Sequence, residues 1–267
     1  MTAETFTPTE HSESPLNTGK PHPARVYDFL IGGRDNYLVD QRVGEALPEI
    51  AKRSAVQNRA FMHRAVEWLA RQGIDQYLDI GTGIPTEPNL HQIAQLADPA
   101  SRIVYADNDP VVLRHAVARL ISSPEGATKY VQADVRDPLA ILQRAGELLD
   151  FGRPVALSLI ALLHFLPDTD DPWGITRTLV DALPAGSFLV LSHSTADFHR
   201  RLEGPVLNAY GDGGITVRPR SREEVERFFE GLDLVEPGLV TAPKWYRDTA
   251  PPEDEDCALY AGVARVG

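Results

Sequence analysis

Short apolar runs alternate with helical apolar periodicity along most of the chain. The runs cover residues 76–80, 102–106, 129–133, 154–160 and 187–192. In the segments between these runs, apolar residues recur at three- and four-residue spacing. This alternation predicts buried strands joined by helices, the pattern of a parallel sheet with helices on both faces.

The C-terminal part of the chain breaks this alternation. Ser221 and Glu224 have capping-box spacing at the start of a helix. The helix leads to an apolar segment at 232–240 and, after a Pro-rich acidic loop, to a terminal strand that includes Cys257. Two strands without a helix between them predict an antiparallel hairpin at one edge of the sheet. The predicted fold is therefore α/β, a Rossmann-like doubly wound sheet of seven strands, mostly parallel.

The residues before the first strand divide into two parts. Residues 1–20 are rich in Thr, Glu, Ser and Pro, which predicts a disordered leader. Residues 21–73 have helical periodicity, which predicts a helical N-terminal cap in front of a domain at 74–267. The apolar positions that carry this periodicity are Val26, Phe29, Leu30, Val43, Ala46, Leu47, Phe61, Ala65, Trp68 and Leu69.

The first strand ends in a glycine turn. Its apolar residues, 76–80, are followed directly by Gly81, Thr82 and Gly83, and glycine allows the backbone to approach a ligand closely. Thr86 is expected to cap the next helix. A strand, a glycine turn, a helix and a second strand that ends in an acid form the architecture of a site for a ribose-bearing cofactor.

Pairs of aspartates follow the second and third strands, and each pair divides into a helix cap and a free carboxylate. Asp109 and Asp137 each precede a proline, the signature of an N-cap before the first helical residue. Asp107 is left without a structural role and is placed to accept hydrogen bonds from both ribose hydroxyls. Asp134 is the corresponding candidate for contact with an adenine amino group.

The glycines alone fit a dinucleotide and S-adenosylmethionine (SAM) equally well. A pyrophosphate needs backbone amides at the helix start and a third glycine for close packing. In this chain Thr86 replaces that glycine, and Pro85 and Pro88 have no N–H. SAM has a ribose and an adenine but no phosphate, so the loop favours SAM.

The charge of the chain limits its partners. Asp and Glu outnumber Lys and Arg by 38 to 26, which gives a net charge of −12. Such a surface repels nucleic acid unless a basic patch compensates, and the sequence has no long block of Lys and Arg. We therefore expect no nucleic-acid partner.

Cysteine content and hydropathy limit the class of protein further. One cysteine, Cys257, excludes an intramolecular disulfide and a cysteine-rich metal site, and its apolar surroundings predict a core thiol. No His or Cys set has the spacing of metal ligands, so no metal is expected. No apolar run approaches the ~20 residues of a membrane span, and the N-terminus has no signal-peptide pattern. The expected protein is a cytoplasmic enzyme without a membrane partner.

Several motifs resemble those of class I SAM-dependent methyltransferases. They are DIGTG at 79–83, Asp107, Ala133-Asp134, LLHFLPD and LPAGSFLVLSH. The segments PHPARVYDFLIGGRDNY, NRAFMHRAVEWLA and RPRSREEVERFFEGLDLVEPG look like one largely uncharacterised branch that is abundant in actinomycetes. The match covers roughly residue 20 to the end, although the third motif glycine common in class I enzymes is absent.

The resemblance implies a cofactor site and a product, S-adenosylhomocysteine (SAH). Asp79, Gly81 and Gly83 would surround the methionine portion of SAM, Asp107 its ribose, and Asp134 with Val135 its adenine. Arg59 would pair with the methionine carboxylate, because guanidinium geometry suits it, or would lie at a solvated helix start. The full predicted set is Asp79, Gly81, Thr82, Gly83, Asp107, Asn108, Asp134, Val135 and Arg59.

Catalytic candidates are fewer, because methyl transfer by in-line displacement needs mainly alignment, and a base only if the acceptor loses a proton. In GGRDNY, Asp35 and Tyr37 would face the acceptor from a lid, or the segment is only a helix junction. His164, after the fourth strand, is a candidate base or a histidine packed beside Phe165. His193 ends the fifth strand in the same layer.

The leading hypothesis is a SAM-dependent methyltransferase acting on a small molecule. A non-catalytic protein that binds SAM or a nucleoside is the second, since no base is unambiguous. An NAD-dependent oxidoreductase is the third, and the loop prolines and the terminal hairpin disfavour it. The sequence identifies neither the methyl acceptor and its reacting atom nor the oligomeric state.

Overall fold

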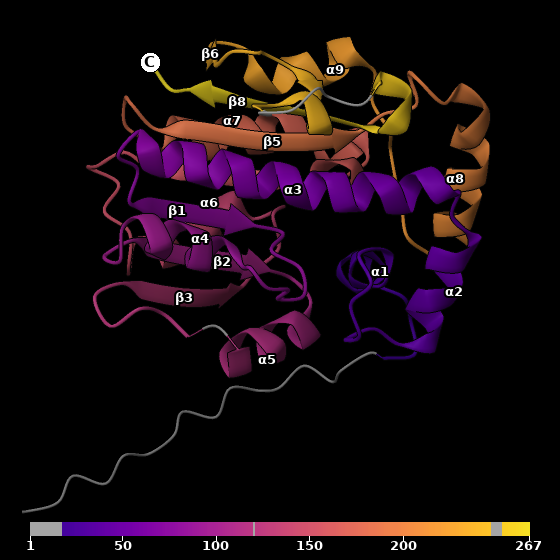
Figure 1. Ribbon diagram of the computed structural model, residues 1–267, viewed down its shortest axis with the longest axis horizontal. Coiled ribbons are helices and arrows are strands. Elements are labelled where there is room, and N and C mark those ends of the chain that lie inside the picture. The colour runs from indigo at the N-terminus through magenta and orange to yellow at the C-terminus, as the bar shows by residue number, and fades with distance from the viewer. Residues whose placement is uncertain (1–17, 120, 247–252) are drawn as a thin grey trace, which may run out of the picture.

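A single eight-stranded sheet runs through the molecule (Figure 1). The structure is a computed structural model that describes residues 18–119, 121–246 and 253–267. The strand order is β3-β2-β1-β4-β5-β8-β6, and β7 also pairs with β8. The strands are β1 (Gln76–Ile80), β2 (Arg102–Asp107), β3 (Ala127–Gln132), β4 (Ala156–Ile160), β5 (Phe188–Ser194), β6 (Asp233–Leu234), β7 (Val240–Thr241) and β8 (Leu259–Arg265).

Strands β1 to β5 are parallel, whereas β8 is antiparallel to β5, β6 and β7. The predicted fold class is therefore confirmed, with one difference in strand number. The segment 232–240, expected as one strand, forms two short strands. A turn separates them, in which Gly238, at φ +82°, donates its N–H to the carbonyl of Val235 at 2.8 Å. Glycine is the residue that adopts this left-handed conformation without strain.

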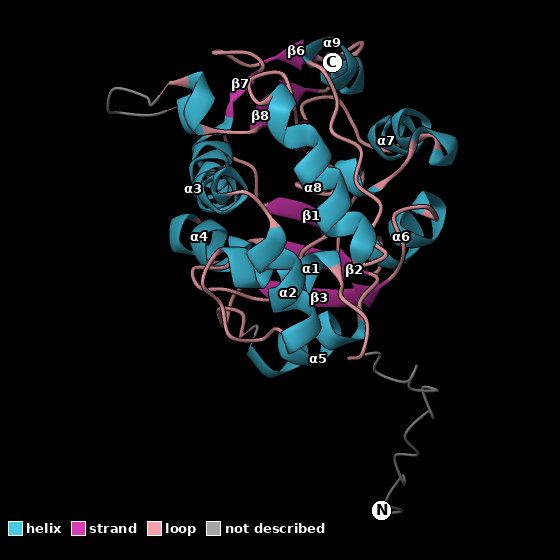
Figure 2. Ribbon diagram, turned by 90° about the vertical axis from the view of Figure 1, so that its right-hand side faces the viewer, coloured by secondary structure: helices cyan, strands magenta, loops and turns pink. Residues whose placement is uncertain are grey.

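Helices cover both faces of the sheet (Figure 2). On one face lie α3 (Glu49–Arg71) and α4 (Leu90–Ala97), and on the other lie α6 (Pro138–Ala145) and α7 (Pro172–Asp181). The apolar residues of α3 that recur at helical spacing, Phe61, Ala65 and Leu69, are at most 1% exposed and pack on the strands. Periodicity in the sequence thus corresponds to burial against the sheet.

The carboxyl ends of the parallel strands are covered by α1 (Pro23–Leu30), α2 (Leu38–Ala46) and α8 (Arg200–Asp212) (Figure 2). The predicted cap region, 21–73, thus contains two kinds of helix, because α1 and α2 lie over this edge while α3 lies along the sheet. The domain boundaries stay predictions. Residues 1–17 of the predicted leader and 247–252 of the acidic loop lie outside the described residues.

Two helices begin at the predicted caps: α5 (Pro110–Arg119) after Asp109, and α6 after Asp137. A third, α7, begins at a further Asp-Pro pair, Asp171-Pro172, and the described residues also form α9 (Arg222–Glu226). Asp109 Oδ1 accepts the N–H of Val111 at 2.9 Å, and Asp137 Oδ1 accepts the N–H of Ala140 at 3.2 Å. The Ser221 capping box at α9 is also confirmed.

One predicted helix start is wrong. The cap of α4 is Asn89 rather than Thr86, and the N–H of Asn89 donates to Gln92 Oε1 at 2.6 Å. Pro88 explains the difference, because the residue before a proline, here Glu87, is driven away from the helical conformation. The loop after the glycine turn is therefore longer than the sequence suggested.

Asp109 also joins α1 to the sheet. Its Oδ2 accepts a hydrogen bond from Arg25 Nε at 3.1 Å and lies 3.2 Å from His22 Nδ1. Arg25 also lies 3.4 Å from Asp40 of α2, and all three side chains of the Arg25 pairs are at most 4% exposed. A buried ion pair that loses one partner leaves an uncompensated charge, so these contacts hold α1 in place.

We expect Asp109→Ala to destabilise the protein more than Asp137→Ala. Asp137 is a cap alone, so its loss should cost about 1 kcal/mol. Loss of Asp109 removes a cap and also one of the two buried carboxylates that pair with Arg25, which should cost about 2–4 kcal/mol. Urea unfolding of both variants gives the comparison. Equal costs would show that the Arg25 contact adds nothing to the cap.

Candidate active site

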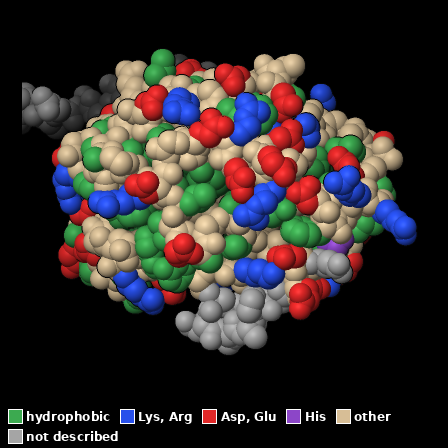
Figure 3. Space-filling model, turned by 90° about the horizontal axis from the view of Figure 1, so that it is seen from above, with side chains coloured by type: hydrophobic (Ala, Val, Ile, Leu, Met, Phe, Trp, Pro, Cys, Tyr) green, Lys and Arg blue, Asp and Glu red, His purple; other side chains and the backbone are tan. Residues whose placement is uncertain are grey.

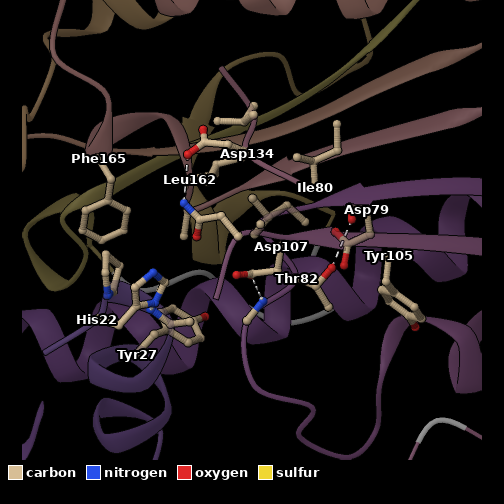
Figure 4. Close-up of a pocket in the computed structure, with 18 of the residues that line it drawn as sticks. His22, Tyr27, Asp79, Ile80, Thr82, Tyr105, Asp107, Asp134, Leu162 and Phe165 are labelled. Carbon is tan, nitrogen blue, oxygen red and sulfur yellow. Dashed lines mark hydrogen bonds between the residues drawn. The ribbon is translucent and has the colours of Figure 1, made fainter. Parts of the chain in front are cut away.

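A cavity of about 410 Å³ lies at the carboxyl ends of β1, β2, β3 and β4 (Figure 4). The strand order reverses between β1 and β4, which is where ligands bind in open α/β sheets. Its volume falls within the ~300–1,000 Å³ of small-ligand sites. All nine predicted cofactor residues line it: Arg59, Asp79, Gly81, Thr82, Gly83, Asp107, Asn108, Asp134 and Val135.

The glycine turn after β1 forms one wall of this cavity. Gly81 and Gly83 have φ values of +77° and +68°. A Cβ atom on Gly81 would lie 2.7 Å from the Leu162 side chain, so this position needs glycine for close packing. Around Gly83 the nearest atom to such a Cβ is that of Ala24 at 4.0 Å. The turn is therefore tightly packed at Gly81 and open at Gly83.

Asp107 fixes this turn to the end of β2. Its Oδ2 accepts the N–H of Gly83 at 2.8 Å, and its Oδ1 accepts the N–H of Asp109 at 2.9 Å. These two bonds show that the prediction of no structural role for Asp107 is wrong, and the residue is only 6% exposed. Each carboxylate oxygen keeps a second lone pair, so the group still has capacity for ribose hydroxyls.

Asp134 lies at the end of β3 with its side chain 39% exposed. It accepts hydrogen bonds from the backbone N–H of Arg136 at 2.9 Å and from Asn108 Nδ2 at 3.1 Å. Partial burial alone would raise the pKa of Asp134, but the bonds from Arg136 and Asn108 and the Arg136 charge together lower it. An ionised Asp134 accepts hydrogen bonds only, which suits an amino group as its partner.

Asp79 and Arg59 lie on the β1 side of the cavity. Burial raises the pKa of Asp79 to about 6, although the Arg59 charge is among the effects that lower it. Arg59 Nη2 donates to the carbonyls of Thr86 and Pro88, while its Nε is buried without a partner among the described residues. Arg59 lies in the middle of α3, so the alternative of a solvated helix start is wrong.

The N-terminal helix contributes a wall that the sequence analysis missed. Besides Tyr27, four consecutive residues at the start of α1 line the cavity, Pro21 to Ala24. His22 caps α1, and its Nδ1 accepts the N–H of Ala24 at 3.3 Å. The His-Pro pair before an apolar helix was a signal for this cap position, but only the fold brings it to the cavity.

The GGRDNY segment forms a helix junction outside the cavity. Asp28 Oδ2 accepts the N–H of Asp35 at 2.9 Å and Asn36 Nδ2 at 2.7 Å, which closes the turn between α1 and α2. Tyr37 caps α2, and its ring centroid lies 5.4 Å from the guanidinium carbon of Arg25. Neither Asp35 nor Tyr37 is among the residues that line the cavity. Their catalytic role stays a prediction that the geometry does not favour.

The two candidate histidines are buried and uncharged at neutral pH. Burial lowers the pKa of His164 to about 3 and that of His193 well below its usual value. His193 bonds on both sides, to Arg220 Nη1 at 2.9 Å and to the carbonyl of Ser194 at 2.8 Å. A pKa near 3 makes His164 a weak proton acceptor at pH 7, since an efficient base has a pKa near the working pH. Neither lines the large cavity.

Arg220 explains why His193 is held so tightly. The Arg220 side chain, in a residue 1% exposed, donates to the carbonyls of Leu163 and Leu166 and to Asp168 Oδ1 at 2.6 Å. It thus ties the segment after β4 to β5. His193 belongs to this structural network, which the sequence analysis did not anticipate because its members are far apart in the chain.

The described residues indicate which cofactors the site can hold. They contain no group of three or more His, Cys, Asp or Glu side chains that could hold a metal ion. They do fit SAM, on three observations of the cavity. The turn is open at Gly83, the Nε of Arg59 is buried without a described partner, and the carboxylates stand at the ends of β2 and β3.

Comparison with known proteins agrees with this site. The model of the S-adenosyl methyltransferase family matches residues 9–267. A DUF574 family protein from Streptomyces avermitilis is 48% identical, with 94% of this chain and 99% of that chain covered and a TM-score of 0.89. A candidate methyltransferase from Thermobifida fusca is 36% identical, with 94% and 96% covered and a TM-score of 0.83.

More distant structures share the fold alone. Magnesium protoporphyrin IX methyltransferase from Synechocystis PCC 6803, solved with bound SAH, is 12% identical, with 94% of this chain and 96% of that chain covered and a TM-score of 0.54. Among curated proteins, none matches this chain significantly. The family match over most of the sequence is decisive: the chain belongs to the S-adenosyl methyltransferase family and is a SAM-dependent methyltransferase.

Proposed function

We propose that the 410 Å³ cavity is the SAM site and that the protein methylates a small molecule. One observation carries the proposal: nine residues chosen from strand ends and motifs line a single cavity at the point where the strand order reverses. The residues come from α3 and from the carboxyl ends of β1, β2 and β3. This edge of the sheet is where a cofactor with a ribose and an adenine binds in such folds.

The roles follow from the order of the strands. Asp107 at the end of β2 takes the ribose, and Asp134 with Val135 after β3 takes the adenine. The methionine portion then lies toward β1 and α3, where Asp79 faces its ammonium group and Arg59 its carboxylate. The opposite charges of Asp79 and Arg59 match the two charged ends of an amino acid.

The protein contributes alignment more than proton transfer. When bound, SAM supplies an electrophilic methyl group on a sulfonium sulfur. The residues from Pro21 to Ala24 form one wall of the cavity. Holding reactants in attack geometry contributes up to ~7–11 kcal/mol, which is the main effect available here.

Surface and composition support a small acceptor rather than a nucleic acid. On the face that carries β6 and α9, basic and acidic side chains are interspersed without a continuous basic stripe (Figure 3). Together with the net charge of −12, this arrangement gives a phosphate backbone little attraction. Among the described helices, none is long and apolar enough to cross a membrane. We place the protein in the cytoplasm, where thiols such as the buried free Cys257 stay reduced.

The N-terminal signature supports membership of the actinomycete branch. Its residues form α1 and the junction to α2, and His22, Ala24 and Tyr27 from this segment line the cavity. The similar proteins named above come from Streptomyces avermitilis and Thermobifida fusca, which fits that branch. We infer that the signature marks an N-terminal wall of the cofactor site.

Titration calorimetry with SAM, SAH and NAD tests the cofactor. We expect both SAM and SAH to bind and NAD to bind at least a hundredfold more weakly. The reason is that Pro85 and Pro88 remove two amides that a pyrophosphate would use. Binding of NAD without binding of SAH would overturn the proposal.

Asp107→Asn is expected to raise the dissociation constant of SAH tenfold or more. A hydrogen bond to a charged group contributes ~1.5–3 kcal/mol, and the amide also loses the acceptor for Gly83 or for Asp109, so stability should fall as well. Asp137→Asn is the matched control, because Asp137 follows the next strand but does not line the cavity. Unchanged SAH affinity in Asp107→Asn would contradict the ribose assignment.

SAH affinity is expected to fall as the pH drops below about 6. The raised pKa of Asp79 means that this carboxyl is partly protonated there, whereas the ammonium group of SAH favours the ionised form. Binding near pH 6 should therefore release a proton, which calorimetry in two buffers of different ionisation enthalpy detects. His22 also faces the cavity, so Asp79→Asn serves to isolate the Asp79 contribution. Equal proton release by both proteins would exclude Asp79 as its source.

A further inference from the structure

A second cavity, of about 100 Å³, lies beside the first, beneath α8. We propose that it is the acceptor pocket and that it takes a neutral ring compound with one hydrogen-bonding substituent. The inference rests on the proposed cofactor site, since it requires SAM in the larger cavity. The pocket is formed by residues of α1, α3 and α8 and by the segments after β4 and β5.

The two cavities share a wall. Tyr27, Ala161 and Phe165 line both of them. The two cavities thus adjoin, and an occupant of the smaller cavity reaches the cofactor by extending its reacting atom past these side chains into the larger cavity. A methyl acceptor needs such a position, because the reacting atoms must approach to ~3–3.5 Å.

The lining of the smaller cavity is mainly apolar, as seen in Leu30, Ile50 and Val206. Its lining contains no Lys or Arg among the described residues, while Glu203 is acidic. A carboxylate or phosphate placed here would lose its hydration without gaining a lysine or arginine partner. Of the two histidines in the lining, His164 and His199, burial lowers the pKa of His164 to about 3, so that ring stays neutral. The lining therefore selects an uncharged, apolar occupant.

Two polar atoms of the lining residues lack a hydrogen-bond partner among the described residues. These atoms, Ser194 Oγ and His199 Nε2, are buried. An unsatisfied buried polar group costs ~1–3 kcal/mol, so a ligand that bonds to it is favoured. A hydroxyl or amino substituent on the ring supplies that bond.

The size of the cavity fits one ring. An apolar protein cavity of ~150 Å³ is known to bind benzene. At about 100 Å³ this cavity is smaller, so it takes one ring at most, and larger parts of the acceptor would extend past the shared wall toward the larger cavity. A polymer segment with charged or bulky groups would not fit.

A chain of hydrogen bonds holds the shared wall in place. The N–H of Ala161 donates to Ser192 Oγ at 3.0 Å, and Ser192 Oγ donates to Asn58 Oδ1 at 2.6 Å. Asn58 Nδ2 donates to the Tyr27 hydroxyl at 3.0 Å, and that hydroxyl donates to the carbonyl of Ala55 at 3.0 Å. Tyr27 is thus a positioning residue, held between the cavities by bonds on both sides.

The backbone conformation of Ala161 also indicates that this shared wall has a function. Its φ of +53° is in the left-handed region, which costs a residue other than glycine roughly 1–2 kcal/mol. Such conformations persist where surrounding bonds enforce them, and they gather at functional sites. Here the N–H of Ala161 is bonded to Ser192, so the network enforces the strained position.

Fluorine NMR of the full-length protein saturated with SAH tests the pocket. The probes are 4-fluorophenol, fluorobenzene and 4-fluorobenzoate. We expect 4-fluorophenol to bind most tightly and 4-fluorobenzoate at least tenfold more weakly. Nuclear Overhauser effects between the phenol ring protons and SAH should show that the two ligands are adjacent. Binding of the benzoate as tight as that of the phenol would overturn the inferred chemistry.

Two substitutions on α8 locate the binding. Val206→Trp fills the cavity and should weaken 4-fluorophenol binding tenfold or more. Leu207→Trp is the matched control, because Leu207 is 39% exposed and does not line the pocket. Both variants should keep SAH affinity. Equal phenol binding by the two variants would overturn the location.

Ser194→Ala tests the polar atom without adding bulk to the core. It should weaken 4-fluorophenol severalfold and leave fluorobenzene unchanged, and equal losses for both probes would contradict the role of Ser194. The binding measurements with SAH and with 4-fluorophenol also distinguish the proposed cofactor site from the proposed acceptor pocket. Failure of SAH to bind the wild-type protein would reject the cofactor site. Binding of SAH without binding of 4-fluorophenol would reject the acceptor pocket alone.

Discussion

The Asp107 carboxylate sets the geometry on which the cofactor site depends. By accepting the amides of Gly83 and Asp109, it joins the turn after β1 to the start of the helix after β2. Both segments then have fixed positions at the strand ends. Burial raises the pKa of Asp107, and the hydrogen bonds from the amides of Asp109 and Gly83 oppose that effect by favouring the ionised form. The ionised form also suits a ribose. Folding and cofactor binding therefore select the same residue at this position.

Much of the fold and of the cofactor cavity could be predicted, because local chemistry determines both. Buried strands show as apolar runs, and Asp-Pro pairs such as Asp109-Pro110 mark helix starts. Parallel strands bring their carboxyl ends to one edge. Residues near the ends of three different strands, such as Asp79, Asp107 and Asp134, can therefore be placed together from the sequence alone. The predicted cofactor set followed from this rule and from the family resemblance.

The remaining features depend on contacts between distant parts of the chain. Arg25 and Asp109 are 84 residues apart, and their pairing is what brings α1 over the cavity. Arg220 similarly makes His193 a structural residue through a hydrogen bond. The position of His193 near the end of β5 does not indicate that bond, because Arg220 is distant in the sequence. The predicted start of α4 is wrong because two local signals conflict: Thr86 is a good capping residue, but Pro88 disfavours a helical conformation at Glu87. In each case the decisive interaction is tertiary, or the local signals conflicted.

The loop between Gly83 and Asn89 supports the proposed preference for SAM over the dinucleotides that bind to related folds. Pro85 and Pro88 remove donors, and Arg59 occupies the carbonyls of Thr86 and Pro88 from the other side. The loop discriminates against phosphate by lacking donors, not by adding a contact to the sulfonium. Replacing Thr86 by glycine would leave Pro85, Pro88 and Arg59 in place. A change of cofactor class thus requires several simultaneous substitutions, which makes this specificity robust to single mutations.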